Sequence, residues 1–229
     1  MAAYNKAIMK ITVTIMLIVM LSMAAPSAWA KLDKTKQKEY EVKTAFIYNF
    51  LKFIDWPKPA KPKTSETEKD DPKAKTITVG FIMNPEAFEI CKILHGKKIK
   101  TKTLRVVRFD AILLKDVQAG KTSKVLESLR RCDILFFSQL VTATPKSASV
   151  LQVLTALKDE NILFIGEMPG FIEPKTKGAL CGIFNFFLED QKIKFEVNND
   201  MAKTKGFAIK AQLLKLAKRV IQTKNNGEK

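Results

Sequence analysis

Histidine and cysteine are scarce in this chain, which has one His and three Cys among 229 residues. So few ligands exclude most His-rich and Cys-rich metal sites, and a Ser-His-Asp hydrolase would have to use the single histidine, His95. No motif pairs His95 with a cysteine nucleophile, and its place at a predicted helix end suits a cation that the helix dipole favours. We therefore expect no catalytic residue and no metal site, and we expect that the protein is not an enzyme.

Glycine-rich phosphate loops are also missing. Gly120-Lys121-Thr122 is similar to the end of a P-loop, but Lys115 replaces the upstream glycine. No G-x-G-x-x-G follows the strand that ends at Ile82-Met83-Asn84, which argues against a Rossmann dinucleotide site. The sequence therefore predicts a protein without a cofactor.

Acidic residues are few, with 23 Asp+Glu against 40 Lys+Arg and a formal net charge of +17. Arginine, which recognises bases and phosphates better than lysine does, stands at only five positions. The lysines are spread through loops and both termini. We expect no nucleic-acid partner, and we interpret the charge as solvation or as attraction to an anionic membrane surface, a polysaccharide or an acidic partner.

One long apolar run is present, over residues 11–23, after Lys6 and Lys10 and before Ala28-Trp29-Ala30. This order of basic, apolar and small residues predicts a secretory signal peptide over residues 1–30, cleaved after Ala30. The run is shorter than the about 20 residues of a membrane span, so an uncleaved anchor is the less favoured alternative. Residues 31–229 then form the mature chain, which we expect to be a single domain.

A helix is predicted over residues 37–54, with one face formed by Val42, Phe46, Asn49, Phe50 and Phe53. Asp55-Trp56-Pro57 ends it, because proline disfavours helical geometry in the residue before it. Residues 57–75 are rich in Pro and Lys and almost lack apolar side chains, so we predict a solvated, flexible insertion there.

Strand and helix patterns alternate after the insertion. Strands are predicted at 77–83, 104–109, 133–137 and 162–165, with helices at 85–94, 122–131 and 146–158; a hairpin over 182–188 and 192–197 and a final helix over 207–223 follow. Strands separated by helices indicate parallel βαβ units covered on both faces. The expected fold is α/β: a three-layer sandwich with a mostly parallel central sheet, a C-terminal antiparallel hairpin and helices on both faces.

The cysteines suggest a disulfide, because an exported protein meets an oxidising compartment. Cys91 and Cys132 both lie at the edge of the predicted sheet, and a bridge between them would close a loop of about 40 residues and stabilise the fold by about 4 kcal/mol. Cys181 is left over: it is a buried apolar residue, an intermolecular link, or the true partner of one of the others. Burial is favoured, because Leu180 and Ile183 beside it are apolar.

Three asparagines, Asn49, Asn185 and Asn198, stand in apolar surroundings, and a buried amide must find hydrogen-bond partners. One interpretation is that they tie neighbouring elements together, and Asn198 can also cap the helix that follows. The other is that they line a pocket for a small ligand. The candidate pocket consists of Phe46, Asn49, Phe50, Trp56, Gly182, Asn185 and Asn198.

The segment over residues 41–57, EVKTAFIYNFLKFIDWP, resembles the opening helix of YfiR-like (HmsC-like) periplasmic proteins, which has the form V-K-A-A-F-x-Y-N-F-x-K-F-x-x-W-P. Supporting matches are the cysteine-led strand at 132–136, the glycine-led strand at 182–186, and the segments at 194–198 and 211–217. The resemblance covers about residues 40–222. It differs from the best-known members in the insertion at 57–75 and in the absence of a second cysteine pair, since only Cys181 remains.

The resemblance implies a periplasmic regulator rather than an enzyme. Its best-known members bind the periplasmic domain of an inner-membrane diguanylate cyclase and repress it, and an outer-membrane lipoprotein sequesters the repressor, with effects on cyclic-di-GMP and biofilm formation. Members are stabilised by disulfides and form homodimers. A periplasmic small-molecule-binding protein that uses the Asn49, Trp56 and Asn185 pocket is the alternative function.

Overall fold

The computed structural model describes residues 33–57, 76–110, 117, 123–139, 147–174 and 181–223. The chain divides into two units, Met1–Asp33 and Lys34–Lys229, and the fold below is that of the second unit. The predicted signal peptide lies outside the described residues, and so does the predicted insertion except for Pro57.

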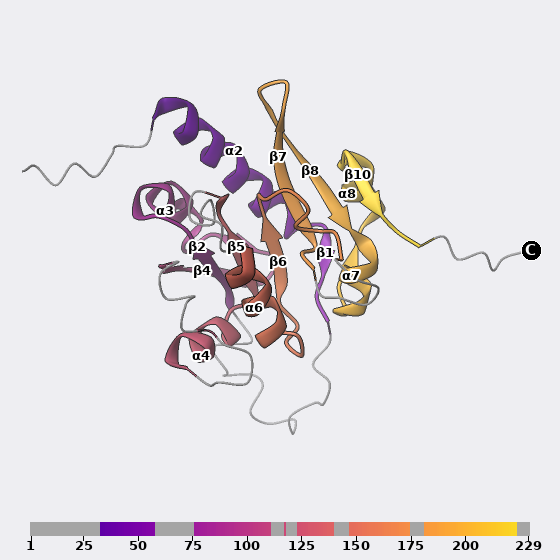
Figure 1. Ribbon diagram of the computed structural model, residues 1–229. Coiled ribbons are helices and arrows are strands. Elements are labelled where there is room, and N and C mark those ends of the chain that lie inside the picture. Colours follow the sequence, from indigo (N-terminus) through magenta and orange to yellow (C-terminus); the bar gives the residue numbers. More distant parts are fainter. Residues whose placement is uncertain are drawn as a thin grey trace, which may run out of the picture. The chain divides into compact units, whose positions relative to one another are not determined.

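An eight-stranded sheet forms the centre of this unit (Figure 1), with the strand order β10-β8-β7-β6-β5-β2-β4-β3. The strands are β2 (Thr76–Ile82), β3 (Lys98–Ile99), β4 (Lys102–Phe109), β5 (Ile134–Phe137), β6 (Leu163–Gly166), β7 (Phe184–Glu189), β8 (Lys192–Asn198) and β10 (Arg219–Ile221). The four strands predicted as parallel are parallel neighbours, in the order β4-β2-β5-β6. All four residues of β5 and of β6 are buried, as is typical of parallel strands that are covered on both faces.

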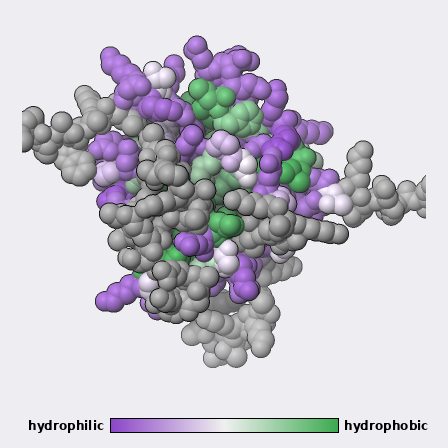
Figure 2. All heavy atoms as spheres, in the orientation of Figure 1, coloured by the Kyte–Doolittle hydropathy of each residue, from purple (hydrophilic) through white to green (hydrophobic). Residues whose placement is uncertain are grey.

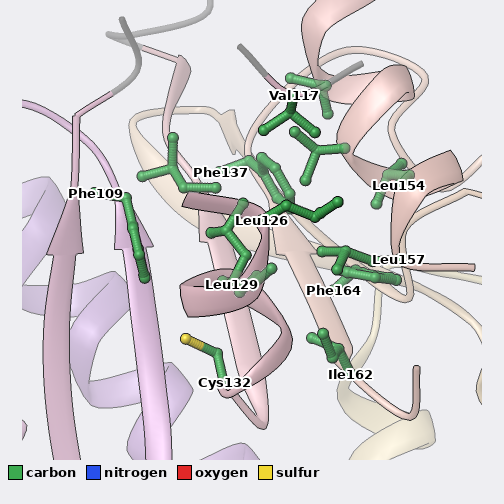
Figure 3. Close-up of a cluster of buried hydrophobic side chains, with 14 of the residues drawn as sticks. Phe109, Val117, Leu126, Leu129, Cys132, Phe137, Leu154, Leu157, Ile162 and Phe164 are labelled. Carbon is green, nitrogen blue, oxygen red and sulfur yellow. The ribbon is translucent and has the colours of Figure 1, made fainter. Parts of the chain in front are cut away.

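Helices cover both faces of the sheet. They are α2 (Lys34–Phe50), α3 (Pro85–Cys91), the short 3₁₀ helix η1 (Lys92–Leu94), α4 (Lys124–Arg130), α6 (Ser147–Ala156), α7 (Asn199–Thr204) and α8 (Ala211–Leu216). On one face, Phe88 of α3 contacts Phe81 of β2, with 6.3 Å between the ring centroids. On the other face, Leu126 of α4 and Leu154 of α6 pack with Phe137 of β5 (Figure 3). The predicted α/β sandwich is therefore confirmed.

The opening helix is rotated and shortened relative to its prediction. The buried face of α2 consists of Tyr40, Lys43, Thr44, Ile47 and Phe50, whereas two members of the predicted stripe, Val42 and Asn49, are exposed. The helix ends at Phe50, and the chain then turns into a short strand, β1 (Ile54–Asp55), which pairs antiparallel with β9 (Ala208–Ile209). The prediction was wrong in register because the buried face includes polar side chains that find their partners elsewhere in the fold.

The C-terminal third combines a confirmed prediction and a wrong one. The hairpin of β7 and β8 is antiparallel, with Glu189 opposite Lys192 and a two-residue turn between them. The single helix predicted over residues 207–223 is instead β9, α8 and β10. Backbone pairing overrides helix propensity here, because the Lys210 amide donates to the Phe53 carbonyl and the Lys218 amide donates to the Phe195 carbonyl.

Phenylalanines dominate the core beneath α2. Phe50 stacks on Phe184 of β7 at 4.8 Å between ring centroids, and it meets Phe195 of β8 at 4.7 Å. Phe46 joins the same cluster, 5.9 Å from Phe186. Aromatic pairs at these separations add to the free energy of burial, so α2 is anchored to the hairpin strands by its own second half.

Candidate functional site

A buried ionic network joins α2 to the end of two central strands. Glu167 directly follows β6 and Ser138 directly follows β5, so both lie at the carboxyl ends of neighbouring parallel strands. The amine of Lys43 on α2 forms an ion pair with Glu167, and each side chain is only 4% exposed. The carboxyl end of a parallel sheet is where open α/β proteins place their ligands, so this network is the first feature to consider as a site.

Both oxygens of the Glu167 carboxylate accept hydrogen bonds. Oε1 accepts hydrogen bonds from the Tyr40 hydroxyl at 2.7 Å, the Ser138 hydroxyl at 2.8 Å and the Gln139 backbone amide at 2.7 Å, while Oε2 accepts from Lys43. Lys43 also donates to Glu39 Oε1 at 2.5 Å. Burial, reinforced by the neighbouring negative charge of Glu167, raises the pKa of Tyr40 far above its usual value, so its hydroxyl remains a proton donor.

The network is structural rather than a ligand site in this state. Among the described residues, no buried side-chain nitrogen or oxygen lacks a hydrogen-bond partner, and neither Lys43 nor Glu167 lines the two grooves that border α2. What the arrangement does is fix the position of α2 on the sheet. Local sequence patterns do not predict this network, although Lys43 on the helix and Glu167 directly after a buried strand are polar residues in apolar surroundings.

One groove, the hairpin groove, lies between α2 and the tip of the β7–β8 hairpin and has a volume of about 690 Å³. Its lining residues are Lys34, Thr35, Lys38, Glu39, Val42, Phe46, Leu188, Gln191, Lys192 and Ile193. Figure 2 shows apolar residues, in green, between hydrophilic ones, in purple, over the region of α2 and this hairpin. The hairpin groove is thus lined by apolar side chains, and exposed lysines form its rim.

The second groove, the helix groove, lies between α2 and α3–η1 and has a volume of about 610 Å³. Ala45, Tyr48 and Asn49 of α2 face Ile90 and Ile93 across it. The ring of Tyr48 has the amines of Lys52 and Lys97 over it, at 4.4 Å and 5.5 Å from the centroid. Asn49, an expected pocket residue, therefore lines a groove, but its amide oxygen accepts from Lys52 at 3.0 Å on the surface.

The expected pocket is divided by the sheet. Phe46 and Phe50 pack on the α2 face with Phe184 and Phe186. Asn185 lies between those two phenylalanines on β7, and since successive side chains of a strand point to opposite faces, it faces away from α2. The structure therefore separates Asn185 from Phe46 and Phe50, two aromatic members of the candidate set.

The amide members tie backbone segments together on the other face. Asn185 accepts from the Met168 amide at 2.9 Å and donates to Glu196 at 3.0 Å. Asn198 donates to the Ile172 carbonyl at 2.9 Å and caps α7 by accepting from the Met201 amide at 2.8 Å. The interpretation of these two amides as links between elements is the one that the structure supports.

Gly182 and Trp56 take separate positions. A Cβ atom on Gly182 would lie 2.0 Å from the ring of Phe171, so this position accepts only glycine. Trp56 is half-buried at the end of β1, with its ring 5.4 Å from that of Phe207 in an edge contact. Neither residue belongs to the two grooves, so their contribution is to packing.

The expected Cys91–Cys132 bridge is not formed in the structure, in which Cys91, Cys132 and Cys181 are free and buried. Cys91 accepts a hydrogen bond from Thr44 of α2 at 3.3 Å. Cys132 packs beside Gly80 in the core under α4, on the opposite face of the sheet (Figure 3). The sheet thus separates the two sulfurs, a separation that sequence spacing could not reveal. The burial predicted for Cys181 is confirmed.

Neither a metal-binding cluster nor a membrane-spanning helix occurs among the described residues. In this part of the chain, no three His, Cys, Asp or Glu side chains lie together where they could hold a metal ion. Within the same residues, no helix has the length and apolar character needed to cross a membrane.

Fold and site together define an α/β sandwich protein whose first helix is locked onto the sheet by a buried ionic network and flanked by two grooves. The chain belongs to the YfiR/HmsC-like family, whose model matches residues 40–218. This family is regulatory and groups periplasmic proteins of cyclic-di-GMP signalling. The match confirms the resemblance of the opening helix and of the later segments.

Two solved structures align with the chain at low identity and with TM-scores below 0.5. A conserved-domain protein from Vibrio cholerae O1 biovar El Tor aligns with a TM-score of 0.49 and 12% identity, over 79% of this chain and 60% of that one. The chain therefore spans about 60% of that relative's length. The ABC domain from Streptococcus pneumoniae, solved in complex with L-Trp, aligns with a TM-score of 0.42 and 11% identity, over 64% of this chain and 55% of that one. No curated protein matches the chain.

Proposed function

We propose that this protein is a periplasmic repressor, which binds the periplasmic domain of an inner-membrane sensor, a diguanylate cyclase, and holds that sensor inactive. The observation that carries the proposal is the family match over residues 40–218, which includes nearly all of the described unit. A signal peptide over residues 1–30, cleaved after Ala30, would deliver the chain to the periplasm.

Repression of this kind is a binding equilibrium. The protein must bind the inactive state of the sensor more tightly than the active state, because only differential affinity shifts the population. A surface held rigidly before binding loses less conformational entropy on association. The Lys43–Glu167 pair and the phenylalanines under α2 hold the outer surface of this helix in place, which supports its use as a binding platform.

Release requires a competitor. We include in the proposal an outer-membrane lipoprotein that sequesters the repressor, and a homodimer as the form that circulates in the periplasm. Light scattering on the purified mature chain measures the dimer directly, because its mass is twice that of the monomer. A monomeric mass at micromolar concentration would contradict that part of the proposal.

The central experiment is made in the host of this chain. We expect deletion of its gene to raise cellular cyclic-di-GMP several-fold, and the full chain to restore the low level. Residues 31–229 expressed without the leader form the control, because they fold in the cytosol and cannot reach a periplasmic domain. A pull-down of the tagged chain from solubilised membranes, read by mass spectrometry, should recover the cyclase.

Two results would contradict the proposal. One is an unchanged cyclic-di-GMP level in the deletion strain. The other is full complementation by the leaderless chain, because repression would then occur in the cytosol.

The helix groove is the observation that favours a second function, the binding of a small molecule in the periplasm. Its apolar wall of Ala45, Ile90 and Ile93 adjoins the polar groups of Tyr48 and Asn49, a composition typical of ligand sites. A thermal-shift screen with nucleotides and aromatic metabolites tests this function. A compound that raises the melting temperature of the wild type but not that of Ala45→Trp would support it.

A further inference from the structure

The tip of the β7–β8 hairpin is held in an unusual backbone conformation. Asp190 and Gln191 form its two-residue turn with φ angles of 49° and 59°. Both angles are left-handed, as a type I′ turn requires. Aspartate is common at the first position of such turns, but Gln191 stands at the second position, where glycine is usual, so its backbone is strained. Strain of this kind persists where the surrounding structure enforces it and is concentrated at functional sites.

This turn projects an exposed apolar side chain over α2. Leu188, two residues before the turn, is 57% exposed and lies opposite Ile193 on β8. Across the hairpin groove, Val42 on α2 is 37% exposed. The groove therefore has apolar side chains on both walls that no described residue covers fully, and an open apolar surface of this kind is typical of an interaction site.

The rim of the hairpin groove is basic. Lys34, Lys38 and Lys192 line it and are exposed. Its one carboxylate, Glu39, is already engaged, because it accepts hydrogen bonds from Lys36 at 2.6 Å and from Lys43 at 2.5 Å. Within the described residues, no carboxylate forms an ion pair with the three rim lysines. Glu189 lies opposite Lys192 but forms its ion pair with Lys218, so the unpaired charges of the rim are positive.

We propose that the hairpin groove binds an acidic, amphipathic segment of a partner protein, with an apolar side chain placed between Leu188 and Val42 and carboxylates beside Lys34, Lys38 and Lys192. This inference rests on the proposed function, in which the partner is the periplasmic domain of the sensor. Complementary charges steer such an encounter and fix its register.

Charge and shape exclude the other occupants. A second copy of this chain would bring a net charge of +17 per full sequence towards a basic rim, which opposes association through this face. An anionic membrane surface would attract the lysines, but a lipid surface is broad, whereas Val42 and Leu188 line the two walls of a hollow between a helix and a hairpin. A protein segment narrow enough to enter the hollow satisfies both features.

Photo-crosslinking in the living host tests the inference. The full chain, with its leader, carries p-benzoylphenylalanine in place of Leu188, and a second strain carries it in place of Leu216 on α8, which is 70% exposed and outside both grooves. After illumination, mass spectrometry identifies the crosslinked peptide itself. We expect position 188, and not position 216, to crosslink to a protein segment that is rich in both acidic and apolar residues.

Charge reversal supplies the second arm of the experiment. The triple variant Lys34→Glu, Lys38→Glu and Lys192→Glu should lower the yield of the adduct at position 188 by about tenfold. The matched control is Lys215→Glu, an exposed lysine on α8, which should leave the yield unchanged. All of these lysines are exposed, and an unchanged melting temperature of each purified variant shows that the fold is intact.

Each remaining outcome overturns the inference: an adduct between two copies of this chain, an adduct with lipid alone, no adduct at position 188, or a yield that charge reversal does not change. The partner's identity separates the two proposals. An acidic, apolar segment of a protein other than a membrane sensor would support the groove and contradict the proposed function. A sensor recovered by pull-down, without an adduct at position 188, would support the proposed function and contradict the inference about the groove.

Discussion

Glu167 is nearly inaccessible to water, and its carboxylate accepts four hydrogen bonds, from Tyr40, Ser138, Gln139 and Lys43. Removing one partner of a buried ion pair costs about 3 to 5 kcal/mol, and the lower end of this range applies here because Lys43 keeps its ion pair with Glu39 when Glu167 is replaced. We therefore expect Glu167→Gln to lower the free energy of unfolding by about 3 kcal/mol, as measured by urea denaturation followed by circular dichroism.

Two further variants isolate the pair itself. The double variant Glu167→Gln, Lys43→Met leaves neither charge of the pair. Its loss of unfolding free energy should therefore be smaller than the sum of the losses in the two single variants. Glu189→Gln removes the exposed ion pair with Lys218 and should change stability by less than about 0.5 kcal/mol. If Glu167→Gln were as mild as Glu189→Gln, the network would not hold α2.

Glu39 links the same network to pH. Burial alone would raise the pKa of Glu39, but hydrogen bonds from Lys36 and Lys43 outweigh burial and hold the pKa below its usual 4.5. A carboxyl group whose pKa is lower in the folded state stabilises the fold above its unfolded pKa, and this contribution is lost as pH falls through the folded pKa. We expect acid titration of stability to show a decline below about pH 4.5 that is smaller in Glu39→Gln. Identical curves for wild type and variant would contradict the assignment.

The cysteines are buried as thiols, and their reactivity should reflect this. Burial raises the pKa of Cys91 and of Cys132 to about 12, and that of Cys181 to about 11, so little thiolate forms at neutral pH. We expect alkylation by iodoacetamide at about pH 8 to be slow in the native protein and fast in denaturant. Mass spectrometry without reductant counts the modified thiols. Three in denaturant agree with the structure, and one would show that a disulfide had formed.

At the scale of elements, β10 is a three-residue edge strand that pairs with β8 and that the side chain of Arg219 ties to two glutamates. Arg219 donates to Glu196 Oε2 from Nε at 2.9 Å and from Nη2 at 2.6 Å, and also to Glu173 at 2.9 Å. Glu196 is buried, and among the described residues Asn185 is the side-chain partner that remains when the arginine is removed. We expect Arg219→Ala to lower the unfolding free energy by about 1 to 2 kcal/mol and to increase hydrogen exchange in β10.

Lys218→Ala is the matched control for this prediction. Lys218 is the adjacent residue, and its ion pair with Glu189 is exposed, so its loss should cost less than about 0.5 kcal/mol. Its backbone amide still donates to the Phe195 carbonyl after the substitution. Equal effects of the two variants would show that the backbone, rather than Arg219, holds β10.

The parallel strands could be predicted because a strand that is buried on both faces has a continuous apolar run in the sequence, such as Ile134–Phe137. The buried face of α2 could not, because Lys43 is buried through a glutamate 124 residues away in the sequence. The same long-range dependence explains the wrong final helix, since Arg219–Ile221 is a strand only in the presence of β8. Local periodicity cannot reveal a partner that the fold supplies.

In the candidate site, too, local contacts could be predicted and long-range ones could not. Phe46 and Phe50 were correctly placed together, because residues four apart share a helix face. Their grouping with Asn185 failed because the sheet lies between them, and sequence order does not say on which side of a strand a helix packs. The hairpin groove could not be predicted for the same reason, because Val42 and Leu188 line one groove only when the hairpin lies beside α2.

At the scale of the whole molecule, the excess of Lys and Arg over Asp and Glu predicts how association depends on salt. Raising the ionic strength from about 0.01 M to about 0.15 M shortens the Debye length from about 30 Å to about 8 Å. If the sensor domain is acidic, as we propose for its docking segment, its association rate should fall about tenfold over this range while the dissociation rate changes little. Surface plasmon resonance with the immobilised domain measures both rates.

The two rates distinguish the apolar contact of the docked state from the electrostatic attraction that precedes docking. Leu188→Glu removes an apolar contact of the docked state, so it should mainly raise the dissociation rate, whereas reversal of the rim lysines Lys34, Lys38 and Lys192 should lower the association rate and flatten its salt dependence. An association rate that is independent of salt would mean that the lysines serve solvation alone. The partner would then be recognised by its apolar surface, and the net charge would say nothing about what this protein binds.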